Sequence, residues 1–390
     1  METNHYIILI ALCSLVLISH VFNVVAKYLR IPSVLLLISL GALLKYGSLY
    51  FNVRIFEISD FVSFLGSIGL ILIVLEGVLD LRIERKNIGI IRKSFGAALF
   101  ILLLSVGFIA SLFYFWFKVD LTSSLINAIP LAVISSAIVI PSIHHLSTDK
   151  RNFLTYEAIF SDILGIMLFN FVLTQGALSL SGFAVQTLAA AVISVIISYI
   201  LVLLIYQMKT KTKVFIILSL LVLIYAAGKL FHQSSLLLVF VFGMILGNFT
   251  YLTKVLRLKV DHVIDTASEL AQFKLIVDES AFLLRTFFFI AFGYSINVES
   301  LLSLNVLMVG VPIVLILLGI RFVYLNFIVR THVFPELFIA PKGLITILLF
   351  YSIPQNLLIA SISEGVLLFV IIATGMLMII GGAWKYQSTE

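Results

Sequence analysis

Long apolar stretches recur along nearly the whole chain, and they constrain the fold more than any other feature. The first runs from Tyr6 to about Ala26, and the last ends near residue 383. A membrane-spanning helix needs about 20 consecutive apolar residues, and continuous apolarity is typical of helices rather than of a transmembrane barrel. Hydrophobic residues make up 62% of the chain and charged residues only 11%, which excludes a soluble enzyme and a nucleic-acid-binding module.

The sequence predicts an all-α integral membrane protein with about thirteen spanning helices. The N-terminal stretch lacks a basic segment and a cleavage site, so we interpret it as the first span rather than a signal peptide. The longest polar stretch, roughly 251–279, is too short for a soluble domain and is interpreted as a surface connector or an amphipathic helix between two halves. One transmembrane domain is therefore expected over 1–390. The predicted spans are 7–26, 31–46, 61–79, 95–117, 124–144, 154–175, 183–206, 213–230, 234–250, 280–296, 301–325, 337–353 and 364–383.

The basic residues orient this predicted bundle. Most of the 25 Lys and Arg residues fall in the loops that are cytoplasmic if the N-terminus lies outside. Because Lys and Arg are retained on the cytoplasmic side, we expect an outside N-terminus and a cytoplasmic C-terminus in the cell (inner) membrane. The single cysteine, Cys13, excludes an internal disulfide and a multi-cysteine metal site. No cofactor, nucleic-acid partner or bound metal other than a transported monovalent cation is expected.

An acidic residue near the middle of the sixth span is the strongest functional signal. Asp162 lies about 13 Å into that helix at about 1.5 Å per residue, and an unpaired charge at this depth is costly. Glu157, Ser161 and Gly165 share one helix face beside it, and Gly165 permits another helix to approach closely. We interpret Asp162 as a carboxylate that alternately binds a proton and a cation. The alternative is an acid that caps or pairs with a neighbouring helix.

The fifth span carries two hydroxyl groups ahead of a proline. Ser135 and Ser136 lie at mid-depth, and Pro141 removes a backbone donor. A helix broken here exposes carbonyl and hydroxyl oxygens suited to Na⁺ or K⁺, and broken backbone is tolerated at this depth where it is buried or lines a cavity. The alternative is an ordinary proline kink in which both serines bond to their own backbone.

The twelfth span contains two helix breakers on either side of a charge. Lys342 lies between Pro341 and Gly343. An interrupted span in each half of a chain is typical of inverted-repeat transporters. Lys342 either offsets the negative end of a half-helix or snorkels to the interface. The predicted first repeat, linker helix and second repeat cover about 7–175, 183–206 and about 213–383.

Three further features have weaker support. Arg285, in the tenth span, enters from the same side as Glu157, so we predict an ion pair between them; the alternative is that Arg285 snorkels. Glu76, in the third span, either extends a cation pathway or is a polar helix end. His144 and Asp149 match the H-x4-D spacing of some membrane acyltransferases, but no supporting motif accompanies this short match.

At these residues the chain resembles the monovalent cation:proton antiporters, specifically bacterial and archaeal sodium/proton exchangers of the NhaP type. Glu157-Ala-Ile-Phe-Ser161-Asp162 is similar to the family's Glu-Ser-x-x-Asn-Asp signature, with the acids at the same spacing. Four other segments resemble family segments in the same order: Arg30-Ile-Pro-Ser-Val-Leu with Gly41, Leu75-Glu76-Gly77 with Leu79, Leu284-Arg285-Thr286-Phe287-Phe288-Phe289 with Gly293, and Pro341-Lys342-Gly343-Leu344.

The resemblance implies a fold in which two interrupted helices cross beside the ion site. It implies that Asp162 is the essential cation- and proton-binding carboxylate, and that Glu157 and Arg285 form a stabilising ion pair near it. It also implies a homodimer in the lipid bilayer. A core domain that moves against a dimer-forming domain then exposes the site to each side in turn, for protons from one side and cations from the other.

Two departures from the family pattern are informative. Ser161 stands where the family has Asn, and Ser135-Ser136-Ala137 replaces a Thr-Asp-Pro motif. Because one acid is left at the centre, we expect one proton to exchange for one monovalent cation, which is electroneutral. Na⁺ is the expected cation and K⁺ the alternative. A passive cation channel and a non-transporting ion sensor are the other functional interpretations.

Overall fold

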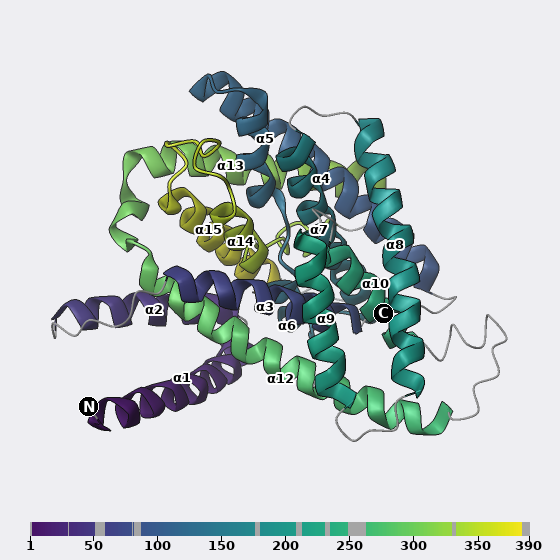
Figure 1. The fold of residues 1–390 in the computed structure, drawn as a ribbon. Helices are drawn as coiled ribbons and strands as arrows, with labels where there is room; N and C mark the ends of the chain where they lie inside the picture. Colours follow the sequence, from purple (N-terminus) through teal and green to yellow (C-terminus); the bar gives the residue numbers. More distant parts are fainter. Residues whose placement is uncertain are drawn as a thin grey trace, which may run out of the picture.

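The computed structural model describes residues 2–29, 31–50, 59–79, 81, 87–175, 180–207, 213–230, 235–248, 263–329 and 333–383. All regular secondary structure in these ranges is helical, as the apolar patterning predicts (Figure 1). The first half contains α1 (Glu2–Leu29), α2 (Ser33–Tyr50), α3 (Ser59–Leu79), α4 (Ile88–Phe117), α5 (Leu121–Ala132), α6 (Ser136–Ser142) and α7 (Thr148–Gln175). The second half contains α8 (Leu180–Gln207), α9 (Lys213–Leu230), α10 (Ser235–Gly247), α12 (Val263–Ser295), η2 (Val298–Leu302), α13 (Leu304–Val323), η3 (Tyr324–Val329), α14 (Leu344–Tyr351) and α15 (Glu364–Ala383).

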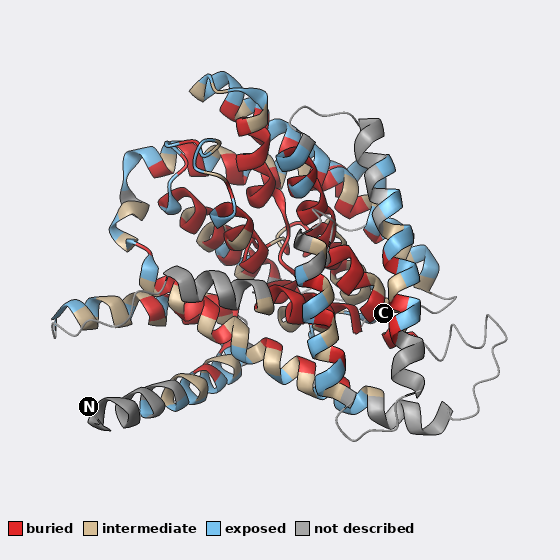
Figure 2. Ribbon diagram, in the orientation of Figure 1, coloured by how far each residue is buried: buried red, intermediate tan, exposed pale blue. Residues whose placement is uncertain are grey.

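The lengths and compositions of these helices suit a lipid bilayer. Six described segments are long and apolar enough to cross a membrane: Ser33–Tyr50, Ile88–Phe117, Leu121–Ser142, Thr148–Thr174, Leu304–Ile328 and Glu364–Gly381. Figure 2 shows that buried residues gather at the centre of the bundle, while the outer helices present exposed faces. Those faces carry large apolar side chains such as Phe115 and Leu315, which favours contact with lipid. The chain is a multi-pass membrane protein.

The helices form two packed groups. The first, which we call the α12 group, contains α1, α2, α3, α8, α9, α10 and α12, and the long α12 packs against α2 and α3. The second, the α7 group, contains α4, α5, α6, α7, α13, α14 and α15, with α4 packed against α5 and α7. The groups meet where α3 contacts α6 and α7 and where α10 contacts α7. Figure 1 shows α12 running beneath the α7 group beside α3 and α9.

The second part of the polar stretch 251–279 is helical, as one of its two interpretations has it, but it is not a separate helix between two halves. Residues 249–262 lie outside the described residues, but Val263 onward is helical and continuous with the tenth span in α12. No proline or glycine occurs between Val263 and Gly293, so nothing in the local sequence ends a helix in that stretch. The helix therefore begins well before the predicted start at 280.

Both predicted interruptions exist, but the first is displaced. The backbone is extended at Val133 and Ser135 between α5 and α6, whereas Pro141 lies inside α6. The break is therefore not caused locally by the proline. The second interruption is where Pro341 and Gly343 predict it: 339–343 is non-helical, and α14 begins at Leu344. Turns at 334–338 precede it in place of the helical half predicted from 337.

Candidate functional site

The two interrupted stretches meet at the centre of the α7 group. The backbone N–H of Ser135 donates to the Pro341 carbonyl at 2.9 Å, and the Lys342 ammonium donates to the Ala132 carbonyl at 2.6 Å. A Cβ at Gly343 would lie 2.6 Å from Ser135 Oγ, so only glycine leaves room for this contact. Segments about 200 residues apart in sequence thus form one crossing, as the interruptions predict.

Breaking the fifth span leaves backbone N–H groups without helical partners, and α7 supplies two acceptors. The N–H of Ile134 donates to Ser161 Oγ at 2.9 Å. The N–H of Ser136 donates to Asp162 Oδ2 at 3.1 Å. Buried backbone groups must be paired somewhere, so the adjacent polar residues of α7 hold the extended segment in place.

The predicted polar face of α7 lies against this extended segment. Ser161 binds it through the hydrogen bond to Ile134. One turn further on, a Cβ at Gly165 would overlap the Val133 side chain, so the glycine permits the close approach that its spacing predicts. Asp162, beside this face, reaches the first residue of α6.

Asp162 retains an oxygen that can bind a ligand. The residue is 2% exposed, and its Oδ1 has no hydrogen-bond partner among the described residues. Ser135 Oγ, at the same break, is also buried and without a hydrogen-bond partner there. Carboxylate and hydroxyl oxygens are hard ligands of the kind that small hard cations prefer. Unpaired buried polar atoms are costly, so these two atoms are the candidate ligand atoms of the site.

Lys342 complements the end of the first half-helix. Its ammonium binds the carbonyl of Ala132, the last residue of α5. In an uninterrupted helix that carbonyl would accept from the N–H of Ser136, which here donates to Asp162 instead. A cation at the C-terminal end of a helix is stabilising, which favours the first of the two interpretations of this residue. The Lys342 backbone N–H donates to Thr374 Oγ1 at 3.1 Å and joins the crossing to α15.

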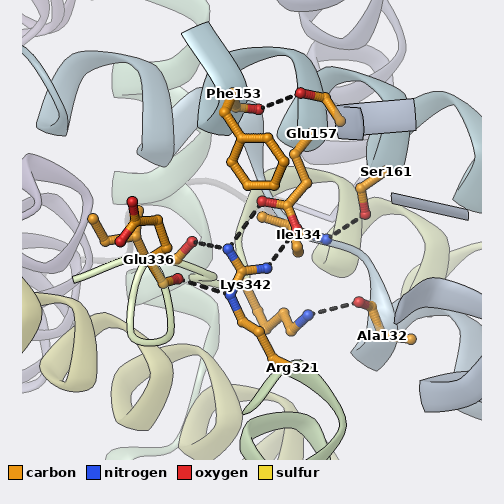
Figure 3. Close-up of polar contacts among 10 residues, drawn as sticks. Ala132, Ile134, Phe153, Glu157, Ser161, Arg321, Glu336 and Lys342 are labelled. Carbon is orange, nitrogen blue, oxygen red and sulfur yellow. Dashed lines mark hydrogen bonds and ion pairs between the residues drawn. The ribbon is translucent and has the colours of Figure 1, made fainter. Parts of the chain in front are cut away.

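The predicted ion pair between Glu157 and Arg285 is wrong, because Glu157 pairs with Arg321 of α13. Arg321 Nη1 lies 2.6 Å from Glu157 Oε1, and Nη2 lies 2.9 Å from Oε2. The Arg321 Nε also donates to the Glu336 carbonyl at 2.8 Å. Figure 3 shows the guanidinium between the Glu157 carboxylate and this carbonyl, with Lys342 next to it. Arg285 belongs to α12, which packs against α2 and α3.

Arg285 pairs with Glu76 of α3 instead. Its Nη2 lies 2.9 Å from both Oε1 and Oε2 of Glu76, and its Nη1 donates to the Ala137 carbonyl of α6 at 3.1 Å. Both charged side chains are partly exposed, at 14% for Arg285 and 24% for Glu76. Glu76 is therefore neutralised by the Arg285 guanidinium inside the bundle.

The sequence analysis predicts no contact for Arg321 or Asn127 at this site. Arg321 had a usable signal, since it is an ionisable residue within an apolar span. The Asn127 amide donates to the Leu357 carbonyl at 2.7 Å, and its oxygen accepts from the Ile359 N–H at 3.4 Å. This joins α5 to the loop before α15, a contact without a sequence signature.

His144 and Asp149 do not contribute to the crossing. Asp149 lies in the first turn of α7 and His144 in the loop before it, and both residues are exposed. Their spacing reflects the short connection between α6 and α7.

Two interrupted helices that cross beside a buried carboxylate are typical of the class of secondary ion transporters. The chain belongs to the sodium/hydrogen exchanger family: the family described as "Sodium/hydrogen exchanger, transmembrane" matches residues 9–385. The protein is a transporter of that family and not an enzyme. The predicted resemblance to cation:proton antiporters is confirmed.

Two solved structures share the fold. The sodium proton antiporter MjNhaP1 from Methanocaldococcus jannaschii, at pH 8, superposes with a TM-score of 0.72 at 19% sequence identity, covering 98% of this chain and 96% of that one. An electron-microscopy map of the same antiporter gives a TM-score of 0.68 at 19% identity, covering 97% and 96%. No curated protein sequence matches the chain.

Proposed function

We propose that this protein exchanges protons for a monovalent cation, with Asp162 as the shared binding group. The observation that carries the proposal is the hydrogen bonding of its two carboxylate oxygens. One oxygen is held by the Ser136 N–H, and the other is buried without a hydrogen-bond partner among the described residues. A proton on Oδ1 and a cation beside it satisfy the same atom, so they compete for it. Competition for one group is the simplest way to couple two ion movements.

The buried charges support an exchange of one proton for one cation. Glu157 and Arg321 neutralise each other through a two-point ion pair. Lys342 supplies a positive charge to balance an ionised Asp162, while its ammonium remains bound to Ala132. Asp162 is then the group that changes its ligand, so each cycle carries one proton one way and one cation the other. Transport by this scheme is electroneutral.

We propose Na⁺ as the cation, with K⁺ as the alternative. Asp162 Oδ1 and Ser135 Oγ are the candidate ligands, with the hydroxyl of Ser136, the first residue of α6, as a further one. These are oxygen ligands, and the two solved structures of similar fold are described as sodium proton antiporters. Ser161 has its oxygen engaged by the Ile134 N–H, so we assign it a positioning role.

The architecture supports alternating access by movement of the α7 group against the α12 group. The candidate site lies within the α7 group, and the contacts inside each group are denser than those between the groups. We further propose that the halves 7–175 and 213–383 are inverted repeats, that the protein is a homodimer in the inner membrane, and that its N-terminus lies outside and its C-terminus in the cytoplasm. The basic loops support this orientation.

Proton movement in proteoliposomes tests the proposal. The purified protein is reconstituted with a pH-sensitive dye inside, and an outward proton gradient is challenged with Na⁺, K⁺ or Li⁺. We expect cation-driven proton flux with at least one of these ions, and its complete loss in Asp162→Asn. Asp149→Asn is the matched control, since it makes the same chemical change at an exposed position. It should retain native flux.

Three outcomes contradict the proposal. Full exchange by Asp162→Asn removes the carboxylate from the mechanism. Cation flux that proceeds without proton movement identifies a passive channel. No flux of any cation in the native chain, with the protein folded, identifies a non-transporting protein. A membrane potential clamped with valinomycin and K⁺ tests electroneutrality, because exchange of one charge for one charge does not respond to it.

A further inference from the structure

The Ala137 carbonyl of α6 has lost its usual hydrogen-bond donor. In an α-helix this carbonyl accepts from the N–H four residues ahead, which here belongs to Pro141, and proline has no N–H. Arg285 Nη1 donates to the carbonyl instead, at 3.1 Å. A side chain of α12 thus completes the hydrogen bonding of the second half of the interrupted fifth span.

The arginine is held in place by its partner on α3. Glu76 accepts from Arg285 Nη2 through both carboxylate oxygens, at 2.9 Å each. Charge-assisted bonds of this kind fix both distance and direction. Glu76 and Arg285 both lie in the α12 group, whereas Ala137 lies in the α7 group. The bond from Arg285 to Ala137 therefore joins the two groups at the half-helix whose first N–H binds Asp162.

The side chains that face α3 beside this bond are apolar. On α3, one residue beyond Glu76, a Cβ at Gly77 would lie 3.5 Å from the Ile159 side chain and 3.7 Å from that of Ile140. Contacts with apolar side chains such as these have no directional preference. A directional hydrogen bond beside a non-directional apolar contact favours one relative position of the two groups.

We propose that Arg285, oriented by Glu76, is a positioning residue that latches α6 to the α12 group and stabilises the arrangement seen here over the alternative one. This inference deepens the proposed function, because it assumes that the two groups move during transport. Pro141 is part of the device: by withholding its N–H, it leaves the Ala137 carbonyl available to Arg285. The latch must open and re-form in each transport cycle.

Two substitutions distinguish an Arg285 that holds the two groups together from an Arg285 that only completes the hydrogen bonding of α6. Arg285→Met removes the donor, whereas Pro141→Ala returns a backbone N–H at position 141 that competes with Arg285 for the Ala137 carbonyl. The reporter is Ile140→Cys in a Cys13→Ser background, since Ile140 is partly buried at the contact between α6 and α3. Its alkylation rate by a water-soluble maleimide in proteoliposomes measures how far the groups have separated.

If Arg285 is a latch, each substitution alone increases the alkylation rate by at least about threefold, because a charge-assisted hydrogen bond is lost or weakened. The double variant then stays as reactive as Arg285→Met, and both single variants change the KM for the cation in the same direction. Ile316→Cys on the distant α13 serves as a control site, and its rate stays the same. Monodisperse elution from a sizing column confirms that each variant is folded.

Two results overturn the proposal. If Pro141→Ala is silent alone and restores native alkylation and exchange to Arg285→Met, then Arg285 only completes the hydrogen bonding of α6. If Arg285→Met leaves the alkylation rate unchanged, the bond does not hold the groups together. The alkylation readout does not depend on transport, so the latch is tested even if the native chain exchanges no cation, and failure of the proposed function is seen separately.

Discussion

Arg321 and Glu157 form a two-point ion pair at 2.6 and 2.9 Å, between side chains that are 2% and 1% exposed. The pair joins α13 to α7 next to the helix crossing. Removing one partner of such a pair leaves a buried charge without compensation, whereas removing both leaves none. Substitution of one or both partners therefore tests how much this ion pair stabilises the α7 group.

We predict that Arg321→Leu lowers the free energy of unfolding by about 3–5 kcal/mol. The double variant Glu157→Leu/Arg321→Leu should be more stable than Arg321→Leu, because neither charge is then left unpaired. Thermal unfolding of the detergent-solubilised protein, with a double-mutant cycle, measures the coupling. A double variant as unstable as the sum of the single ones would contradict this account.

Gly343→Ala should block the crossing. A Cβ there would lie 2.6 Å from Ser135 Oγ and 2.7 Å from the Ile138 side chain, and forcing atoms into a packed site costs about 1–3 kcal/mol. We expect lower stability and loss of exchange, because Ser135 must move. Gly319→Ala is the control, since a Cβ at Gly319 meets nothing within 4 Å. Native exchange by Gly343→Ala would show that the crossing tolerates displacement.

Lys342→Met should have two effects, one on stability through the lost hydrogen bond and one on the apparent KM for Na⁺ through the lost charge. It leaves the Ala132 carbonyl without its donor, at a cost of about 1–3 kcal/mol for a buried group. It also removes a positive charge close to Asp162, so the apparent KM for Na⁺ should fall. Lys342→Arg keeps both the charge and the donor and should shift the KM less. An unchanged KM in Lys342→Met would mean that the ammonium does not act on the cation.

The pH dependence of transport should report on the number of protons in the competition. Because one proton and one cation compete for Asp162, the apparent KM for the cation should fall as the pH rises. For a single competing proton the change is at most about tenfold per pH unit. Initial rates in proteoliposomes at several pH values measure the slope. A slope close to two would require a second titrating group, with Glu76 and Lys342 as the candidates.

Asp120 should contribute a small, pH-dependent stabilisation at the start of α5. Its Oδ2 accepts from the Ser123 N–H at 2.9 Å, and hydrogen bonding from Ser123 holds the pKa of this carboxyl below its usual value. The stabilisation is therefore present above the usual aspartate pKa of about 4 and is lost as the pH falls below it. Asp120→Ala should cost about 1 kcal/mol or less at pH 7, because the residue is exposed.

Unfolding of the native protein and of Asp120→Ala at pH 7 and near pH 3 measures this effect. The difference in stability between them should shrink at the lower pH. Asp120→Asn, which retains a capping oxygen, is the control and should show a smaller difference at pH 7 that does not depend on pH. A difference that grows on acidification would contradict the assigned role.

Much of the site follows from local sequence. The spacing of Glu157, Ser161 and Gly165 predicts one helix face, and Ser161 and Gly165 of that face contact the broken fifth span. Pro341 and Gly343 predict the second interruption, because both residues are poor in helix interiors. The position of the first break was not predictable from Pro141. It depends on acceptors that α7 brings to the N–H groups of Ile134 and Ser136.

Local patterns predict the class of the protein, its helical spans and the acid at their centre, because apolarity, helix breakers and charges within apolar stretches are properties of short segments. Which arginine neutralises Glu157 follows instead from the tertiary packing. Arg285 and Arg321 both lie in apolar spans, and the choice depends on which helix packs against α7. Likewise, the bond from Arg285 to Ala137 depends on the packing of α12 against α3, which in turn contacts α6. Pairings between segments so far apart in sequence are set by helix packing, which no local pattern encodes.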